Sequence, residues 1–289
     1  MLLERTVGVQ VDPPVDLFIA EAPAARSDAP CLLVVHGGPD WDHSYLVEPL
    51  VHLADQMRVL FVDLRGCGRS TRGLPDAEYT PERATTDLVT LLDRVGLRQA
   101  AVLGFSYGGL IAQRLAVAAP DRVSRLVIAS SSVLPAPQGA FAGWDERDQR
   151  LASQTALEEI DPPTPEAIQA AAMATASTNV WQLELLPEYT RRLEQIRFSA
   201  DWAGPWQRGT LPSPRLSDPI ASLAATRIPM LLLHGRQDMT FPVELAEQAQ
   251  DLLPGAQAVI LDDAGHMAHI DQPDAWLAAV RAFLTPARS

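Results

Sequence analysis

A serine flanked by glycines is the first feature of this chain whose residue types and spacing could do chemistry. Ser106 lies in the stretch GFSYG (104–108), after the apolar run 100–105 and before an apolar stretch with helical periodicity. A GxSxG pattern between a strand and a helix is typical of a sharp turn that presents the serine oxygen above a sheet, with glycines where a side chain would collide with neighbouring backbone. Ser106 is therefore predicted to be the nucleophile of an acyl-transfer reaction.

A serine nucleophile needs a base, and two histidines near the end of the chain could provide it. His266 directly follows the apolar run 257–265, and His269 lies three residues further on. A histidine in the loop after the last strand can reach a nucleophile at the same edge of a sheet. We favour His266 because it stands at the exit of the strand, and we expect His269 to be structural.

A carboxylate must orient that base, and Asp238 is our candidate. It follows the apolar run MLLLHG (230–235), so it would stand at the same sheet edge as the serine. The competing position follows the run RLVIAS (125–130), where serines and no carboxylate are found. The chain order of nucleophile, acid and base is a further indication of a serine triad of this arrangement.

Acyl transfer also requires preformed N–H donors for the oxyanion. The string HGGP (36–39) follows the run 31–37 and precedes the serine turn by about 70 residues, a separation that suits an oxyanion loop of this kind. Gly38 is the predicted first donor and the N–H of Tyr107 the second, whereas His36 is expected to hold the loop. This chemistry requires no metal and no organic cofactor.

Short apolar runs alternate with amphipathic stretches and must position these residues. Runs that are apolar on both faces indicate a buried parallel sheet, and helices between them indicate a doubly wound α/β fold. The predicted strands are 6–12 and 16–22, which form an antiparallel hairpin around Pro13-Pro14, then 31–37, 59–66, 100–105, 125–130, 230–235 and 257–265. The predicted helices are 44–56, 80–96 with Thr80 as N-cap, 107–119, 242–253 and 273–284.

The segment 133–216 has no clear strand and is predicted to be a helical cap inserted into a core formed by 1–132 and 217–289. Such an insertion would lie over the carboxyl ends of the strands, where ligands bind in open α/β sheets. Its predicted helices are 145–160, 164–176, 179–186 and 187–198. Its candidate substrate-binding residues are the aromatic Phe141, Trp144, Trp181, Trp202 and Trp206, although most of these tryptophans could instead pack the cap onto the core.

The composition limits the classes of partner. The net charge of −13 and the pI of about 4.8 argue against nucleic acid and against anionic membrane surfaces, because both require a basic face. Cys31 and Cys67 form no CxxC pair and are expected to be free thiols. The first residues do not resemble a signal peptide, and no run approaches the roughly 20 apolar residues of a membrane span. We expect a cytoplasmic enzyme that acts on a small molecule.

These motifs resemble the α/β-hydrolase superfamily over 30–132 and 217–285. The stretch DLRGCGRS (63–70) resembles its DxRGxGxS loop, whose role in the superfamily is mostly structural, and together with HGGP it is most similar to the proline iminopeptidase-related branch. Departures from that branch include Asp40 in place of the glycine of HGGPG, and GFSYG in place of GGSWG. The cap also has no convincing carboxylate cluster for a free amino terminus, since Glu158, Glu159 and Glu184 suit a solvated face.

The predicted function is hydrolysis by acyl transfer through Ser106, His266 and Asp238, with a carboxylic ester or lactone of a small molecule as substrate. An aminopeptidase or amidase similar to proline iminopeptidase is the alternative, and a carbon–carbon bond hydrolase would use the same triad. Aspartate-dependent members of the fold, the epoxide hydrolases and haloalkane dehalogenases, are disfavoured by the serine. A small-molecule receptor on the same fold is the non-enzymatic alternative.

Overall fold

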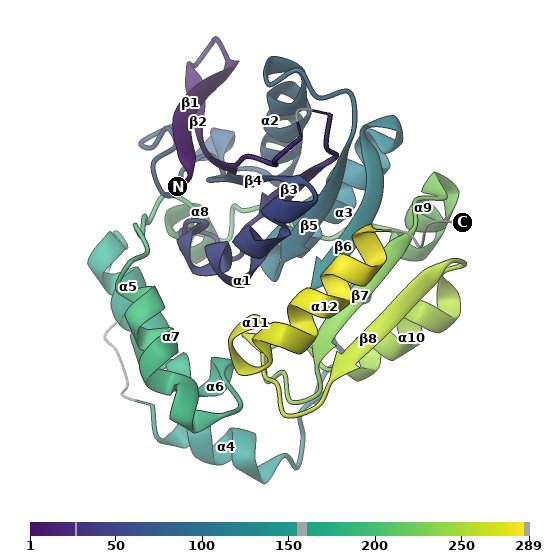
Figure 1. Ribbon diagram of the computed structural model, residues 1–289. Coiled ribbons are helices and arrows are strands. Elements are labelled where there is room, and N and C mark those ends of the chain that lie inside the picture. Colours follow the sequence, from purple (N-terminus) through teal and green to yellow (C-terminus); the bar gives the residue numbers. More distant parts are fainter. Residues whose placement is uncertain (27, 155–160, 286–289) are drawn as a thin grey trace.

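An eight-stranded sheet runs through the centre of the molecule in the computed structural model, which describes residues 1–26, 28–154 and 161–285 (Figure 1). The strand order is β1-β2-β4-β3-β5-β6-β7-β8. β2 is antiparallel to both of its neighbours, β1 and β4, whereas the remaining pairs of neighbours, from β4 and β3 to β7 and β8, are all parallel. The strands are β1 (Leu3–Gln10), β2 (Val15–Ala22), β3 (Cys31–Val35), β4 (Arg58–Val62), β5 (Ala100–Phe105), β6 (Val123–Ala129), β7 (Met230–Gly235) and β8 (Ala256–Leu261). The predicted α/β fold with a mostly parallel sheet is confirmed.

Each face of the sheet packs against its own hydrophobic cluster. In β3, Leu33 and Val35 belong to one cluster, and Leu32 and Val34 belong to the other. Alternation of this kind follows from the two-residue period of a strand, and it explains why the runs are apolar throughout. The first cluster includes side chains of α2 (Pro81–Arg94), α3 (Tyr107–Ala118), α9 (Pro219–Thr226) and α10 (Glu244–Leu252); the second includes those of α1 (Val47–Leu50) and α12 (Pro273–Leu284).

The predicted helix 44–56 is wrong as one element. The structure divides it into η1 (Ser44–Leu46), α1 and η2 (Val51–Asp55), and Glu48 adopts a non-helical conformation with φ −94° and ψ 128°. Glu48 precedes Pro49, and a proline both lacks an N–H and disfavours the helical region for the residue before it. The N-cap prediction is confirmed, since Thr80 Oγ1 accepts a hydrogen bond from Arg83 N at 3.1 Å.

Several short helices connect β6 to β7, and α4 to α7 gather at the lower left of Figure 1. They are α4 (Asp145–Ala152), α5 (Pro165–Ala174), α6 (Ala176–Asn179), η5 (Leu183–Leu185), α7 (Leu186–Leu193), α8 (Ala203–Gln207) and α9. The prediction of a helix over 179–186 is wrong, because Val180 is extended with ψ 139°. Residues 155–160 of the predicted helix 145–160, with Glu158 and Glu159, lie outside the described residues. The division into core and cap stays a prediction.

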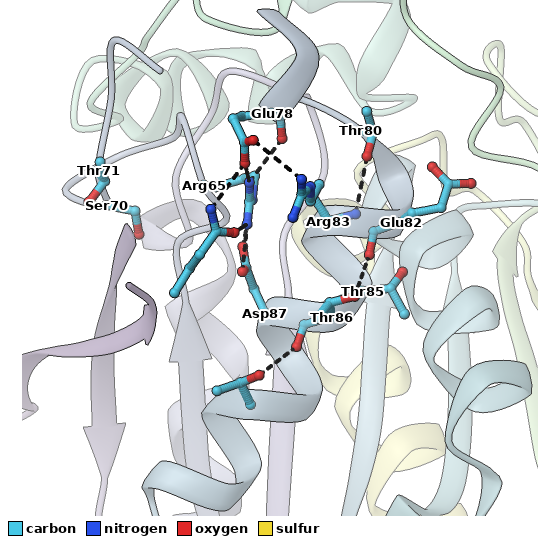
Figure 2. A network of polar contacts seen from close by, with 12 residues as sticks. Arg65, Ser70, Thr71, Glu78, Thr80, Glu82, Arg83, Thr85, Thr86 and Asp87 are labelled. Atoms are coloured by element: carbon cyan, nitrogen blue, oxygen red, sulfur yellow. Dashed lines mark hydrogen bonds and ion pairs between the residues drawn. The ribbon is translucent and has the colours of Figure 1, made fainter. Parts of the chain in front are cut away.

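A buried polar network organises the loop that follows β4 (Figure 2). The guanidinium of Arg65 donates to both carboxylate oxygens of Asp87 at 2.6 and 2.7 Å, and to Glu78 Oε2 at 3.0 Å. Arg65 is 1% exposed, so its charge depends on these acids for compensation. The network joins the loop after β4 to η3 (Asp76–Glu78) and α2, which is the structural role expected for the stretch 63–70.

Cys31 and Cys67 are both buried and unpaired. In the part of the chain that the structure describes, no helix is long and apolar enough to cross a membrane.

Candidate active site

Ser106 stands in a strained turn between β5 and α3. Its backbone has φ 53° and ψ −120°, a region that residues with a Cβ rarely adopt. A Cβ on Gly104 would lie 2.3 Å from Gly108 O, and a Cβ on Gly108 would lie 2.3 Å from His36 O. Both glycines of the GxSxG pattern therefore allow backbone to approach closely, and the turn can form only because they carry no side chain.

A continuous chain of hydrogen bonds joins Ser106, His266 and Asp238. His266 Nε2 lies 3.1 Å from Ser106 Oγ, and His266 Nδ1 lies 3.0 Å from Asp238 Oδ2. The Nδ1–H therefore donates to the carboxylate, which leaves the lone pair of Nε2 directed at the serine hydroxyl. The three residues follow β5, β7 and β8, whose carboxyl ends meet at one edge of the parallel sheet.

The carboxylate of Asp238 accepts hydrogen bonds from backbone N–H groups as well as from His266. Its Oδ1 accepts hydrogen bonds from Thr240 N at 2.7 Å and Phe241 N at 2.9 Å. Burial alone would raise the pKa of Asp238, but His266 and His234 favour the charged form and together lower its pKa below the usual range. The carboxylate thus stays ionised beside His266 across the physiological pH range.

His234 is a neighbour of the acid that the sequence did not single out. Its Nε2 lies 3.2 Å from Asp238 Oδ2 and 2.8 Å from the carbonyl oxygen of Phe241. Burial alone would lower the pKa of His234, but the hydrogen bond and charge of Asp238 outweigh burial and raise it. His234 and Asp238 are four residues apart, but this spacing predicts a contact only when the conformation of the turn after β7 is known.

His269 does not contact the serine. It is fully buried, its Nε2 lies 3.2 Å from the carbonyl oxygen of Tyr45, and its ring packs edge-on against Phe105. His36, likewise buried, has Nδ1 2.6 Å from Gly37 O and accepts a hydrogen bond from Leu64 N through Nε2. These contacts correspond to the structural roles expected for both histidines.

A cavity of about 810 Å³ opens next to the serine. Ser106, His266, Gly38 and Tyr107 all line it. Its remaining wall is mainly apolar and includes Trp41, Leu110, Ile168, Pro214 and Phe241. A cavity of this size with a few polar groups at one point has the properties of a small-molecule site.

The model of the α/β hydrolase fold family matches residues 30–273 of this chain. The chain belongs to this family. The match covers β5, β7 and β8, which precede Ser106, Asp238 and His266, and it includes the whole segment between β6 and β7. The suspected superfamily membership is therefore confirmed.

Relatives within the α/β hydrolases differ in their activities. A 2-hydroxymuconate semialdehyde hydrolase of Pseudomonas sp. strain CF600 is 29% identical, over 89% of this chain and 87% of that protein. A proline iminopeptidase of Heyndrickxia coagulans is 27% identical, over 88% and 90%. The crystal structure of the enol-lactonase from Burkholderia xenovorans LB400 superposes with a TM-score of 0.75 at 22% identity, over 98% of this chain and all of the other. Membership of this family supports hydrolase activity, but it does not determine the substrate.

Gly38 and Tyr107, the predicted oxyanion donors, both border the cavity beside the serine. Gly38 has φ 110°, a conformation that favours glycine. Tyr107 is the first residue of α3, so its N–H has no acceptor within that helix. The two donors come from the ends of β3 and β5, which are adjacent in the sheet.

Asp40, which departs from the iminopeptidase pattern, has a backbone conformation that favours glycine. Its φ is 71°, in the left-handed region that aspartate tolerates better than most residues. The carboxylate accepts hydrogen bonds from Ser199 Oγ at 2.9 Å, Trp202 N at 3.0 Å and Ala203 N at 2.8 Å. Burial raises the pKa of Asp40 to about 6. Asp40 thereby ties the loop that contains Gly38 to the segment before α8.

Most of the predicted aromatic substrate-binding residues require correction. Among the four tryptophans proposed, the structure puts only Trp206 on the wall of the cavity. Trp202 is fully buried and donates its indole N–H to Arg65 O at 2.7 Å, and the guanidinium of Arg150 covers the ring of Trp181. Trp144 lies 6.1 Å from Phe141, ring to ring. Trp202 thus packs its segment onto the core, as the alternative interpretation allowed, whereas the ring contacts of Trp144 and Trp181 lie within the segment 133–216.

Several residues of the cavity wall were not predicted. Trp41 and Phe241 come from loops after β3 and β7, and Arg215 comes from the segment between α8 and α9. The only signal in the sequence was that Trp41 follows HGGP by two residues and Phe241 follows Asp238 by three. In the described ranges, no group of three or more histidine, cysteine or acidic residues is arranged to hold a metal ion.

Proposed function

We propose that this α/β hydrolase is a serine hydrolase that cleaves a carboxylic ester or lactone of a small molecule. The observation that carries the proposal is the hydrogen-bonded series from Asp238 through His266 to Ser106 at the wall of an apolar cavity. A nucleophile, a base within hydrogen-bond reach and a third group that orients the base are the requirements for acyl transfer.

In the proposed mechanism, His266 Nε2 takes the proton of Ser106 as the serine oxygen attacks the carbonyl carbon. The carbonyl electron pair moves onto its oxygen, which the N–H groups of Gly38 and Tyr107 stabilise. The imidazolium, stabilised by Asp238, then returns the proton to the leaving alcohol as the acyl bond breaks. Water, deprotonated by the same histidine, then attacks the carbonyl carbon of the acyl-serine, the bond to Ser106 Oγ breaks, and His266 returns the proton to Ser106 Oγ as the acid is released.

An aminopeptidase is the second candidate, because a proline iminopeptidase is 27% identical to this chain. Such an enzyme must hold a protonated amine, and an unoccupied carboxylate would suit that task. Asp40 is the acidic residue on the described wall of the cavity, and its oxygens already accept three hydrogen bonds. Glu184 lies in a different depression. This arrangement favours the ester or lactone over the peptide.

A carbon–carbon bond hydrolase is the third candidate, supported by the relative that is 29% identical. Such an enzyme would use the same serine, base and acid, but its leaving group would be a carbon atom in place of the oxygen of an alcohol. The choice among these substrates is therefore a question of which carbonyl compound the cavity admits.

The test compares a short-chain aryl ester with a prolyl arylamide on the wild type, Ser106→Ala and the control Ser222→Ala. Ser222 lies on α9 and does not border the cavity. We expect ester hydrolysis that falls by a factor on the order of 10⁶, to background, in Ser106→Ala and persists in the control. Arylamide cleavage that depends on Ser106 would favour the aminopeptidase, and ester hydrolysis that survives Ser106→Ala would refute the proposed nucleophile.

A further inference from the structure

Arg215 brings a positive charge to the wall of the cavity that contains Ser106. It lies in the segment between α8 and α9 and is half-buried. Its side chain reaches the loop after β6, where Nη1 donates to Leu134 O at 3.0 Å and more weakly to Ser132 O at 3.4 Å, and Nη2 donates to Ser132 Oγ at 3.0 Å. These bonds fix the position of the guanidinium.

The hydrogen bonds of Arg215 leave one edge of its guanidinium without a partner among the described residues. A guanidinium has five N–H groups, and the three bonds come from Nη1 and Nη2 alone. Because Nη1 and Nη2 both bind Ser132, we place these bonds on the edge between them, which leaves the N–H of Nε and the adjacent N–H of Nη2 on the edge that binds a carboxylate in a bidentate manner.

The positive charge of Arg215 also has no acidic partner within 4 Å in the described ranges. Arg65, Arg150 and Arg192 also carry buried or half-buried guanidinium groups, and each pairs with an acid at 2.6 to 3.0 Å. Burial lowers the pKa of Arg215, and no carboxylate opposes that effect. An unpaired cation is unfavourable in a half-buried position, and an anion in the cavity would relieve that cost.

The other charged groups on the cavity wall cannot take this role. Asp40 repels anions and is already engaged with Ser199, Trp202 and Ala203, and His266 serves the serine. Arg215 is thus the cation on the described part of the wall that is available to a ligand. Its planar edge suits a planar carboxylate better than a spherical ion.

We propose that Arg215 binds a carboxylate of the substrate, so that the enzyme acts on esters or lactones that carry a second, non-reacting carboxylate. This inference rests on the proposed function, because it assigns Ser106 to the reacting carbonyl at the same cavity. Arg215 acts as a specificity-determining residue: it holds one end of the substrate while Ser106 attacks the other.

The experiment compares two ethyl esters of equal acyl chain length, the neutral ethyl butyrate and the anionic ethyl hemisuccinate, whose ethoxide group is too poor a leaving group for the neighbouring carboxylate to expel. Both are measured with the wild type, Arg215→Met, Arg215→Lys and the control Arg94→Met. Arg94 is exposed at the end of α2, does not border the cavity, and its removal changes the net charge equally. The quantity of interest is the ratio of kcat/KM for the anionic ester to that for the neutral ester.

We expect this ratio to fall by about 10- to 100-fold in Arg215→Met, the value of a charged hydrogen-bonded contact. The Lys variant should recover part of the loss, and Arg94→Met should keep the wild-type ratio. Equal losses for both esters in Arg215→Met, with a lower stability in urea, would show that Arg215 only ties its segment to the loop after β6, and would overturn the proposal. An unchanged ratio would also overturn it.

A binding measurement separates this inference from the proposed function. Calorimetric titration of Ser106→Ala with the hemisuccinate, and of the double variant Ser106→Ala/Arg215→Met, detects the carboxylate site without turnover. Binding that requires Arg215 supports the site even if Ser106 is not the nucleophile. Equal binding of both esters to Ser106→Ala refutes the carboxylate site even if Ser106 proves catalytic.

Discussion

His266 and His269 lie three residues apart, yet their surroundings give them different chemistry. His266 lies between a carboxylate and a serine hydroxyl, whereas the aromatic rings of Tyr45, Phe105 and Trp276 surround His269. Burial lowers the pKa of His269 to about 3, and its Nδ1 has no hydrogen-bond partner among the described residues. A histidine held neutral in this way suits a packing role and not a proton carrier.

The pH dependence of stability follows from His269. Its pKa is about 3 in the folded protein and about 6.5 when unfolded, so between these values only the unfolded state is protonated. Its contribution to stability is therefore complete above pH 6.5 and is lost as the pH falls toward 3. The destabilisation caused by His269→Gln should shrink by about 1.4 kcal/mol for each pH unit below 6.5.

Urea unfolding of the wild type and His269→Gln at pH 7.5, 5.5 and 4.5 tests this expectation. Because both proteins share every other titrating group, the difference between them isolates the histidine. A difference in unfolding free energy that stays constant from pH 7.5 to pH 4.5 would contradict it.

At the scale of elements, the proposed active site depends on loops that follow parallel strands, and polar tethers hold those loops. Asp40 ties the loop after β3 to the segment before α8, and Arg65 ties the loop after β4 to η3 and α2 (Figure 2). Loops carry unpaired backbone groups and have few apolar contacts of their own, so such tethers determine their positions.

We expect Arg65→Met to lower the free energy of unfolding by about 3–5 kcal/mol, because it leaves the buried carboxylate of Asp87 without its partner. The matched control is Arg191→Met, which removes an exposed ion pair with Glu188 and should cost less than about 1 kcal/mol. Chemical denaturation of both variants gives the comparison. Equal losses would mean that the network of Arg65 contributes no more than a surface pair.

At the scale of the whole molecule, the sheet separates two hydrophobic clusters, and both cysteines lie on the same side of it. Cys31 and Cys67 lie in the first cluster, and side chains of α7 reach the second. Burial raises the pKa of Cys31 to about 12 and raises that of Cys67 well above its ordinary value. Thiolates are the reactive form of cysteine, so both thiols should be inert in the folded state.

A thiol-specific chromogenic disulfide at pH 8 should detect no cysteine in the native protein and two in denaturant. Across a urea titration, the appearance of both thiols should follow the loss of circular dichroism, because exposure requires opening of the core. Rapid reaction of one thiol in the native protein would contradict this, and Cys67→Ala would show which cysteine is responsible.

The sequence alone determined those features that depend on local pattern and chain order. The GxSxG stretch, the apolar runs and the order of Ser106, Asp238 and His266 predicted the fold and brought these residues to one sheet edge, because parallel strands end together. The broken helix at Pro49 was also predictable, since the proline is visible in the sequence and its effect on Glu48 is general.

Only the tertiary structure decided which side chains line the cavity and which hold it together. Arg215 meets Ser132 across 83 residues of sequence, and Asp40 meets Ser199 across 159. No periodicity or motif encodes such contacts, because they depend on how the segment between β6 and β7 packs on the sheet. For the same reason Trp206 reaches the cavity while Trp202 fills the core: composition identifies aromatic residues, but packing decides what each one touches.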